Sequence, residues 1–389
     1  MKKGSAASVA RRWTMVLDAC PWTPGSARGA VLPAAIAVLV LAGGCGADDD
    51  RVHATTSAAG SGGVGLQQPG GGGWGGEGGT VAPPSCGPRW PDSPTVLCAG
   101  EQALLDSCPL EGEWGSGQDG SYVGNVPSYE TTEEVVVDSV TTIMWQRESF
   151  FDDSLEPLSQ WRAREYCEEL SLAGFDDWRL PAILELATIA DYGRSYPAMD
   201  AAAFPDPVPR IHWSTTEGYW SYYLKFGPGV VTASDPVGGW MAVRCVRGCT
   251  VSTDFSVSTD GLTVHDYGTG LQWQREAGAW ESRRSFAQAI EDCEQLELAG
   301  YADWRLPNIK ELLTTVDFTA MTGPKIDLDA FIQHDGAWHL WSSSPYVYNY
   351  NEAQKAWYVD LGAGNSYMTS SYYENGVRCV RSAPVDDGP

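Results

Sequence analysis

One stretch of this chain occurs twice: "FDDWRLP" begins at Phe175, and "YADWRLP" begins at Tyr301. The similarity extends to both sides of these stretches. A segment with one cysteine precedes each of them, and "WSTT" or "WSSS" and then a closing "RCVR" follow in the same order. Repetition on this scale predicts two copies of one domain, each with its own core. We place the copies at residues 129–247 and 255–384.

The spacing of apolar residues changes within each copy. Apolar positions recur at helical spacing before and after DWRLP, which predicts two short helices. In the second copy these positions are Phe286, Ala289, Ile290, Cys293 and Leu296, then Ile309, Leu312, Leu313 and Val316. The remainder alternates aromatic and β-branched residues between Gly, Asn and Ser turns, as strands do. We therefore expect an α+β fold in which each copy packs two short helices on a small antiparallel sheet.

Each copy has one cysteine on its first predicted helix and one in "RCVR". In an exported protein the natural disulfides are therefore Cys167 with Cys245 and Cys293 with Cys379. Each would close a loop of about 80 residues and contribute on the order of 4 kcal/mol in the chain-entropy model.

Four further cysteines, Cys86, Cys98, Cys108 and Cys249, allow three pairings. Cys249 lies immediately after the first copy. We expect it to connect the small segment 86–128 to that copy.

Each DWRLP contains an aspartate and an arginine and is followed by a glutamate. These residues are Asp177, Arg179 and Glu185 in the first copy, and Asp303, Arg305 and Glu311 in the second. Paired carboxylates can serve a glycosidase. An acid beside a guanidinium also forms a bidentate buried pair. We favour the structural interpretation, in which the pair fixes the turn between the two helices.

The sequence offers little else for catalysis. The five histidines are scattered, and the best metal candidate is His334 and His339 with Asp335, which we interpret as a polar loop. No nucleophile elbow, phosphate loop or nucleotide-binding glycine motif occurs in a strand-to-helix setting. We therefore expect no enzyme activity, no metal and no cofactor.

The amino terminus is typical of an export signal. Basic residues precede an apolar run from Val31 to Ala42, which is too short to span a bilayer. The run ends in "LAGGC", which resembles the bacterial lipobox. This resemblance implies a signal peptide over 1–44, lipid attachment at Cys45, and an outer-membrane or cell-surface location held by the lipid alone. The Gly-rich stretch within 45–85 predicts a disordered tether.

Charge limits the partners. Acidic residues outnumber basic ones 50 to 25, and the formal net charge is −25. Such a surface repels nucleic acid, anionic lipid and polysulfated glycans unless a cation intervenes. We expect no nucleic-acid partner.

The repeated blocks together resemble the Lcl C-terminal domain family, formerly a domain of unknown function. The resemblance rests on "YC", "DWRLP" followed by "EL", "AFP" or "AFI", "WSTT" or "WSSS", and "RCVR". It implies an exported bacterial protein with two tandem C-type-lectin-like domains, each with a disulfide from helix to last strand. One member is a surface adhesin for sulfated glycans. The Glu-Pro-Asn, Gln-Pro-Asp and Trp-Asn-Asp motifs of calcium-dependent lectins are absent from both copies, so we do not expect sugar binding through calcium.

Aromatic residues that differ between the copies are the candidate binding residues. Tyrosine among Ser, Asn and Gly gives rigid contact area with adaptable hydrogen bonding, and flat rings stack on sugars. The candidates are Tyr346, Tyr348, Tyr350, Trp357, Tyr372 and Tyr373 in the second copy, and Trp220 and Tyr222 in the first. Alternate residues of such strands also fill a core, and we expect about half of the aromatics to do so.

The sequence therefore predicts a lipid-anchored, exported, nonenzymatic binding or adhesion protein that presents two lectin-like domains to an extracellular glycan or protein ligand. Two alternatives stay open. One is a cell-envelope enzyme of the formylglycine-generating type, which has a related fold. The other is a purely structural envelope lipoprotein.

Overall fold

The computed structural model describes residues 86–383, except for 88, 96, 101–103, 106, 111–112, 114, 123, 152–157, 207–209, 235–240 and 348–354. The predicted signal peptide, the lipid attachment site Cys45 and the tether lie outside the described residues. Within the described ranges, no helix is long and apolar enough to cross a membrane.

A small segment precedes the two repeats. It contains a short hairpin and one turn of 3-10 helix: β1 (Cys98–Ala99), β2 (Leu104–Leu105) and η1 (Asp119–Ser121). The Gln118 side chain holds these parts together, because it accepts a hydrogen bond from Ala99 N at 2.7 Å and donates one to Ala99 O at 2.9 Å. We call residues 86–128 the N-terminal segment.

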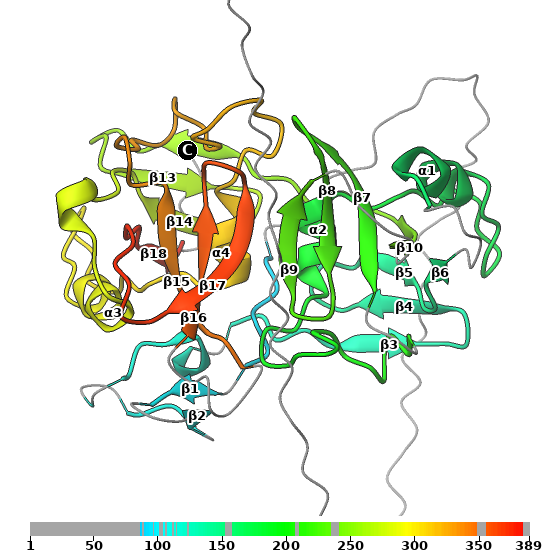
Figure 1. Cartoon of the computed structure of the whole chain (residues 1–389), viewed down its shortest axis with the longest axis horizontal. Coiled ribbons are helices and arrows are strands. Elements are labelled where there is room, and N and C mark those ends of the chain that lie inside the picture. The colour runs from blue at the N-terminus through cyan, green and yellow to red at the C-terminus, as the bar shows by residue number, and fades with distance from the viewer. Residues whose placement is uncertain are drawn as a thin grey trace, which may run out of the picture. The chain divides into compact units, whose positions relative to one another are not determined.

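Two sheets form the first repeat (Figure 1). One is antiparallel in the order β11-β5-β4-β3, so the first and last strands of the repeat share it. Its strands are β3 (Tyr129–Thr131), β4 (Val135–Asp138), β5 (Met144–Gln146) and β11 (Val246–Arg247). The other has the order β6-β10-β7-β8-β9, with β10 parallel to β7. Its strands are β6 (Phe150–Phe151), β7 (Ile211–Glu217), β8 (Ser221–Lys225), β9 (Val230–Ala233) and β10 (Met241–Val243).

The second repeat has the same plan. A four-stranded sheet runs β12-β13-β14-β18 and a three-stranded one β15-β16-β17, and both are antiparallel. The strands are β12 (Phe255–Val257), β13 (Thr263–Asp266), β14 (Leu271–Gln274), β15 (His339–Pro345), β16 (Lys355–Asp360), β17 (Asn365–Ser370) and β18 (Val380–Ser382).

The α+β class is confirmed, but the expectation of one sheet per copy is wrong. The closing "RCVR" strand pairs with the first strands of its repeat, as in Val246 opposite Trp145 and Val380 opposite Trp273. The aromatic-rich hairpins are thereby left to form a second sheet. One pairing in the first repeat is also parallel, which the sequence did not indicate.

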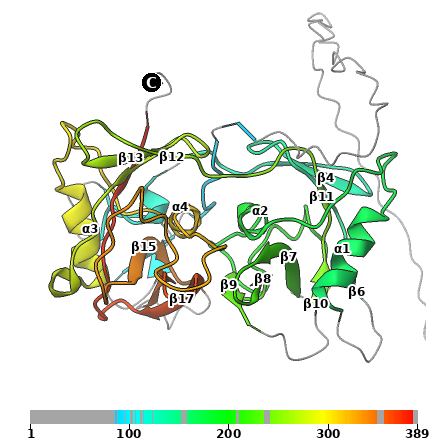
Figure 2. The ribbon, with the colours of Figure 1, turned by 90° about the horizontal axis from the view of Figure 1, so that it is seen from above.

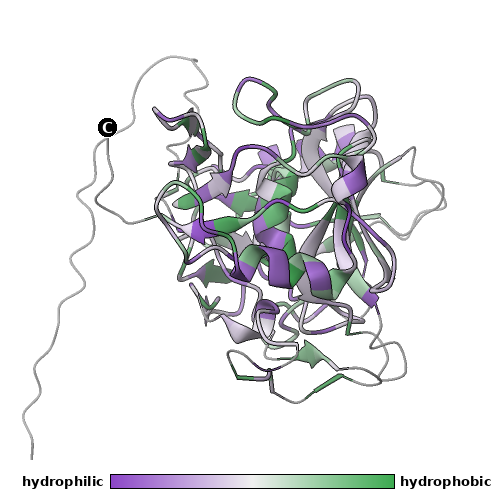
Figure 3. Ribbon diagram, turned by 90° about the vertical axis from the view of Figure 1, so that its left-hand side faces the viewer, coloured by the Kyte–Doolittle hydropathy of each residue, from purple (hydrophilic) through white to green (hydrophobic). Residues whose placement is uncertain are grey.

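The helices lie where the apolar spacing predicts them. They are α1 (Gln160–Glu168), α2 (Ile183–Thr188), α3 (Phe286–Glu294) and α4 (Ile309–Thr314), with a 3-10 turn η2 (Trp280–Ser282) before α3. Figure 3 shows apolar and polar residues alternating around the short helices. In α3 the buried residues are Phe286, Ala289, Ile290 and Cys293. Helix α3 therefore buries one face, as an amphipathic surface helix does, whereas all six residues of α4 are buried.

The disulfide predictions for both repeats are confirmed: Cys167 bonds Cys245 and Cys293 bonds Cys379, with Cα–Cα distances of 5.5 Å in both. Cys249 bonds Cys86, and Cys98 bonds Cys108. Cys249 thus connects the N-terminal segment to the end of the first repeat, as expected.

The two repeats contact each other through matching elements. Helices α2 and α4 are in contact, as are β9 and β17, and Figure 2 shows the two helices next to each other. Across this junction Val231 N donates to Ser366 Oγ and Ala233 N donates to Asn365 Oδ1, both at 2.9 Å. The two aromatic-rich sheets therefore meet the other repeat at their edge strands, β9 and β17.

Candidate functional site

The two DWRLP stretches form the same corner between helices. The tryptophans, Trp178 and Trp304, are each 2% exposed, and each donates its indole N–H to a backbone carbonyl at 3.3 Å. The following arginines bind the glutamates of the next helix through two parallel bonds. These distances are 2.7 and 2.6 Å for Arg179 with Glu185, and 2.7 and 2.6 Å for Arg305 with Glu311. The predicted structural pair is present in both repeats.

The aspartate of each DWRLP has a different partner. Asp177 binds Arg247 and Asp303 binds Arg381, each through two bonds between 2.6 and 3.1 Å. The closing "RCVR" strand is thus attached to the corner by its last arginine. Hydrogen bonding from that arginine lowers the pKa of each aspartate. The acidic residues that could have suggested a glycosidase are all held by arginines.

What lies over the corner differs between the repeats. In the first, Arg179 Nη2 donates to Cys249 O at 3.0 Å, and Val251 N donates to Glu185 Oε1 at 3.4 Å. The stretch after β11 therefore covers the pair directly. In the second repeat, the N-terminal segment approaches the pair instead.

A cavity of about 770 Å³ lies beside the second corner. Its volume is in the range of small-molecule sites. The N-terminal segment and the second repeat both supply its walls. The lining residues are Arg89, Trp90, Asp92, Asp119, Tyr122, Gly124, Asn125, His265, Asp266, Tyr267, Thr269, Gly270, Leu271, Arg305, Asn308, Glu311, Ser343, Ser382 and Ala383.

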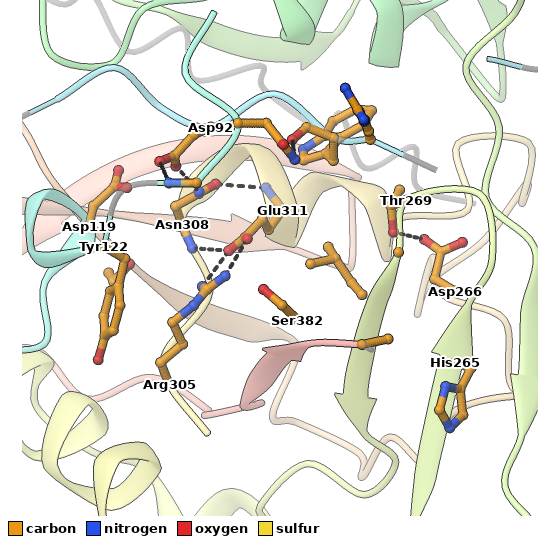
Figure 4. A pocket seen from close by; sticks show the side chains of 18 of the residues that line it. Asp92, Asp119, Tyr122, His265, Asp266, Thr269, Arg305, Asn308, Glu311 and Ser382 are labelled. Carbon is orange, nitrogen blue, oxygen red and sulfur yellow. Dashed lines mark hydrogen bonds and ion pairs between the residues drawn. The ribbon is translucent and has the colours of Figure 1, made fainter. Parts of the chain in front are cut away.

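Asn308 joins the two walls. It is the N-cap of α4, where its Oδ1 accepts from Glu311 N at 2.9 Å. Its Nδ2 donates to Asp92 Oδ1 of the N-terminal segment, also at 2.9 Å. Figure 4 shows this link from Asp92 through Asn308 to Glu311 and Arg305. The segment is thereby held at a defined position over the corner.

The carboxyl groups of this wall are shielded from water. Asp119 is 3% exposed and accepts a hydrogen bond from Ser344 Oγ at 2.5 Å. Burial raises the pKa of Asp119 well above its usual range, and the Asp92 carboxyl raises it further. Burial also raises the pKa of Asp92 and of Asp266. A carboxyl that keeps its proton can donate a hydrogen bond as well as accept one.

Arg305 and several rings complete the cavity. Burial alone would lower the pKa of Arg305, but the Glu311 carboxylate outweighs it and the pKa is raised. The guanidinium also lies 5.3 Å from the Tyr122 ring centre. On the opposite side His265 and Tyr267 stack, with 6.1 Å between ring centres and 17° between planes. The cavity therefore offers flat rings beside a polar wall.

Three of the aromatic candidates are core residues. Trp357 and Tyr222 are each 1% exposed and Tyr346 is 7% exposed. Trp357 packs on Tyr192 of the first repeat with ring centres 5.2 Å apart, and Tyr222 donates its hydroxyl to Ala363 O of the second at 2.8 Å. Their prediction as ligand-binding residues is wrong, because all three side chains are buried.

The other candidates are exposed or lie outside the described residues. Trp220, Tyr372 and Tyr373 are 49%, 69% and 65% exposed. Trp220 packs edge-on against the exposed Tyr219, with ring centres 5.1 Å apart. Tyr348 and Tyr350 fall in the range that the structure leaves undescribed. Trp220, Tyr372 and Tyr373 do not line the cavity described above.

The two histidines proposed as the best metal candidate do not share a site. His334 Nε2 lies 2.9 Å from Glu276 Oε1, and His339 Nε2 lies 3.6 Å from Asp360 Oδ1. Within the described ranges, no group of three or more His, Cys, Asp or Glu could hold a metal ion.

Sequence reasoning missed most of the cavity. Asp92 and Asp119 belong to the N-terminal segment, in which only the cysteines gave a recognisable pattern. Ser343 belongs to a motif that occurs in both repeats and therefore did not indicate a site. One signal was available. Asn308 occupies the helix N-cap where the first copy has Ala182, although the surrounding motif is otherwise nearly the same.

Comparison with known proteins gives matches to one protein-family model. Residues 134–247 and 262–381 each match the family model of the Lcl C-terminal domain. No curated protein matches the chain. The matched ranges contain both corners and all four cysteines of the two intra-repeat disulfides. The chain therefore belongs to the Lcl C-terminal domain family, of which it carries two tandem copies.

Proposed function

We propose that this chain is an exported, lipid-anchored and nonenzymatic binding protein that holds part of a glycan in the cavity beside its second corner. The observation that carries the proposal is the cavity itself, which combines stacked rings with a polar wall. Sugar sites use the same combination, because ring C–H faces stack on aromatics while hydroxyls hydrogen-bond to planar polar groups.

The family assignment and the disulfides support the location. Tandem domains of this family suggest a surface or extracellular protein. All cysteines in the described ranges are disulfide-bonded, which is typical of an oxidising compartment. Attachment through Cys45 would place the repeats outside the membrane at the end of the Gly-rich stretch.

Two observations favour binding over catalysis. The described cysteines are committed to disulfides, so they do not supply the reactive thiols of an enzyme of the formylglycine-generating type. The corner carboxylates are committed to arginines. Trp220, Tyr372 and Tyr373 remain available as additional contacts for a longer ligand, because they are exposed.

A glycan array probed with the purified full-length protein, with and without calcium, tests the proposal. We expect binding that does not require calcium. The variant Ser382→Trp places an indole at the cavity wall and should abolish glycan binding. Glu130→Trp, at an exposed position of the first repeat, is the matched control and should bind normally. Absence of any glycan signal would contradict the proposal.

A further inference from the structure

Two buried polar atoms at the cavity have no protein partner. Trp90 is 5% exposed and Ser343 is 1% exposed, and both residues line the cavity. Among the described residues, neither Trp90 Nε1 nor Ser343 Oγ finds a hydrogen-bond partner. Buried polar groups in folded proteins are normally hydrogen-bonded. Their shared position therefore points to a ligand that completes their bonding.

The types of these atoms restrict the ligand. An indole N–H only donates, so Trp90 requires an acceptor, whereas the Ser343 hydroxyl can donate or accept. Asp92 faces the same space and already accepts from Asn308 Nδ2 at 2.9 Å, from Ser93 N at 2.8 Å and from Gly124 N at 2.8 Å. A carboxylate has about four lone-pair sites, so Asp92 can accept one further bond. A ligand hydroxyl satisfies both requirements, because it donates and accepts.

The charges of the wall disfavour an anionic ligand. Four carboxyl groups line the cavity: Asp92, Asp119, Asp266 and Glu311. The Arg305 guanidinium, which could have received an anion, already binds Glu311 through two bonds of 2.7 and 2.6 Å. A sulfate or carboxylate on the ligand would therefore meet four carboxyl groups, and of the two arginines in the wall only the exposed Arg89 lies outside an ion pair with one of them.

A cationic ligand fits less well than a neutral one. The guanidinium groups of Arg305 and Arg89 line the same cavity. Lys310 lies directly behind the wall, where its Nζ donates to Asp92 O at 3.0 Å. The wall thus carries both signs of charge close together, which suits an uncharged polar ligand.

We propose that the cavity selects an uncharged, hydroxyl-rich saccharide unit, which accepts from Trp90 Nε1, bonds Ser343 Oγ and donates to Asp92. The inference rests on the proposed glycan-binding function and narrows its ligand class. The first repeat lacks the site, because Thr215 takes the place of Ser343 and the stretch at Cys249 and Val251 covers the corner.

Titration calorimetry of the purified full-length protein tests the selection. The probes are glucose, galactose, mannose, N-acetylglucosamine and their disaccharides, each compared with glucuronic acid and a sulfated sugar. We expect neutral probes to bind and the matched anionic probes to bind at least about 10-fold more weakly, the fold-change that like-charge contact produces. Preferential binding of the anionic probes would overturn the inference and leave the glycan-binding function intact.

Two variants test the contacts. Trp90→Phe keeps the ring and removes the donor, and Ser343→Ala removes the hydroxyl. Each should weaken binding of the neutral probe by about 2- to 10-fold, which is the loss of one neutral hydrogen bond. Thr215→Ala in the first repeat is the matched control and should leave affinity unchanged.

The outcomes separate the two proposals. Unchanged affinity in both variants would refute the proposed contacts alone. Binding that Ser382→Trp does not abolish would place the saccharide outside the cavity, which refutes this site in both proposals and leaves only glycan binding itself. Failure of every saccharide, neutral or anionic, in calorimetry and on the array would refute the glycan-binding function together with it. Thermal unfolding of each variant shows whether it is folded before binding is measured.

Discussion

The two corners have the same internal structure and different surroundings. Both contain a buried tryptophan and a bidentate arginine–glutamate pair. The first is covered by the backbone that follows its own repeat, and the second opens onto a cavity whose other wall is the N-terminal segment. The comparison indicates that the shared motif stabilises the fold of each repeat. Whether a cavity lies beside the motif depends on which segment packs against it.

The largest expected effect comes from removing the arginine of either corner. Arg179→Ala and Arg305→Ala each leave a shielded glutamate without its partner, since Glu185 is 0% and Glu311 is 8% exposed. We expect a loss of about 3 to 5 kcal/mol in the free energy of unfolding for both. Urea denaturation of the secreted protein measures it.

Saccharide binding by the same two variants distinguishes the roles of the two corners. Among variants that remain folded at low temperature, only Arg305→Ala should also weaken saccharide binding, because only Arg305 lines the cavity. Arg194→Ala, which breaks an ion pair of a 54% exposed arginine, is the control and should change stability by less than about 1 kcal/mol. Equal binding by the Arg179 and Arg305 variants would contradict the assignment of the site to the second corner.

The next effect concerns Lys310, which stands where the first repeat has Leu184. Its Nζ is buried and donates to Asp92 O and to Thr188 O at 3.0 and 2.9 Å. Burial lowers the pKa of Lys310 to about 8, against 10.5 in the unfolded chain. Between these values the unfolded chain binds more protons, so the free energy of unfolding rises with pH, by up to about 3 kcal/mol.

Lys310→Met should remove this contribution. Denaturation of the wild type and the variant from pH 7 to pH 9.5 measures the difference, in which the titration of other groups cancels. Leu184→Met, at the matching position, should keep the wild-type pH dependence. Parallel stability curves for the wild type and Lys310→Met would show that Lys310 does not titrate in this range.

The smallest effect concerns the helix caps of the corners. Asn308 caps α4 through its side chain, whereas Ala182 begins α2 without a side-chain acceptor. Asn308→Ala should destabilise the protein by about 1 kcal/mol, and Ala182→Asn should stabilise it by a similar or smaller amount. Thermal unfolding of the two variants checks both signs. A neutral Asn308→Ala would mean that neither the cap nor the link to Asp92 stabilises the folded protein.

Local features were predictable from the sequence. Helices α3 and α4 follow from their apolar spacing, and the intra-repeat disulfides follow from one cysteine per predicted helix and one per closing strand. The arginine–glutamate pairs span six residues, so they too are set by local structure. The helices and the arginine–glutamate pairs depend on residues that are close in the chain. The disulfides could be assigned because the same arrangement of cysteines occurs in both repeats.

The cavity was not predictable, because its contacts join distant parts of the chain. Asp92 meets Asn308 across 216 positions, and Asp119 meets Ser344 across 225. The aromatic candidates failed for a related reason. A strand pattern shows two alternating faces, but it does not show which residues contact the other repeat, as Trp357 and Tyr222 do.

The disulfide between Cys86 and Cys249 has a mechanical consequence. It closes a covalent ring across 163 positions, and this ring includes the whole first repeat. A pull applied before Cys86 and resisted by a ligand on the second repeat therefore passes through the bond directly to Cys249. The first repeat carries no tension along that path. The Cys293–Cys379 bond excludes a further 86 positions from extension. Within the described part of the chain, such a load can therefore lengthen the stretch between Cys249 and Cys293 and the stretch beyond Cys379.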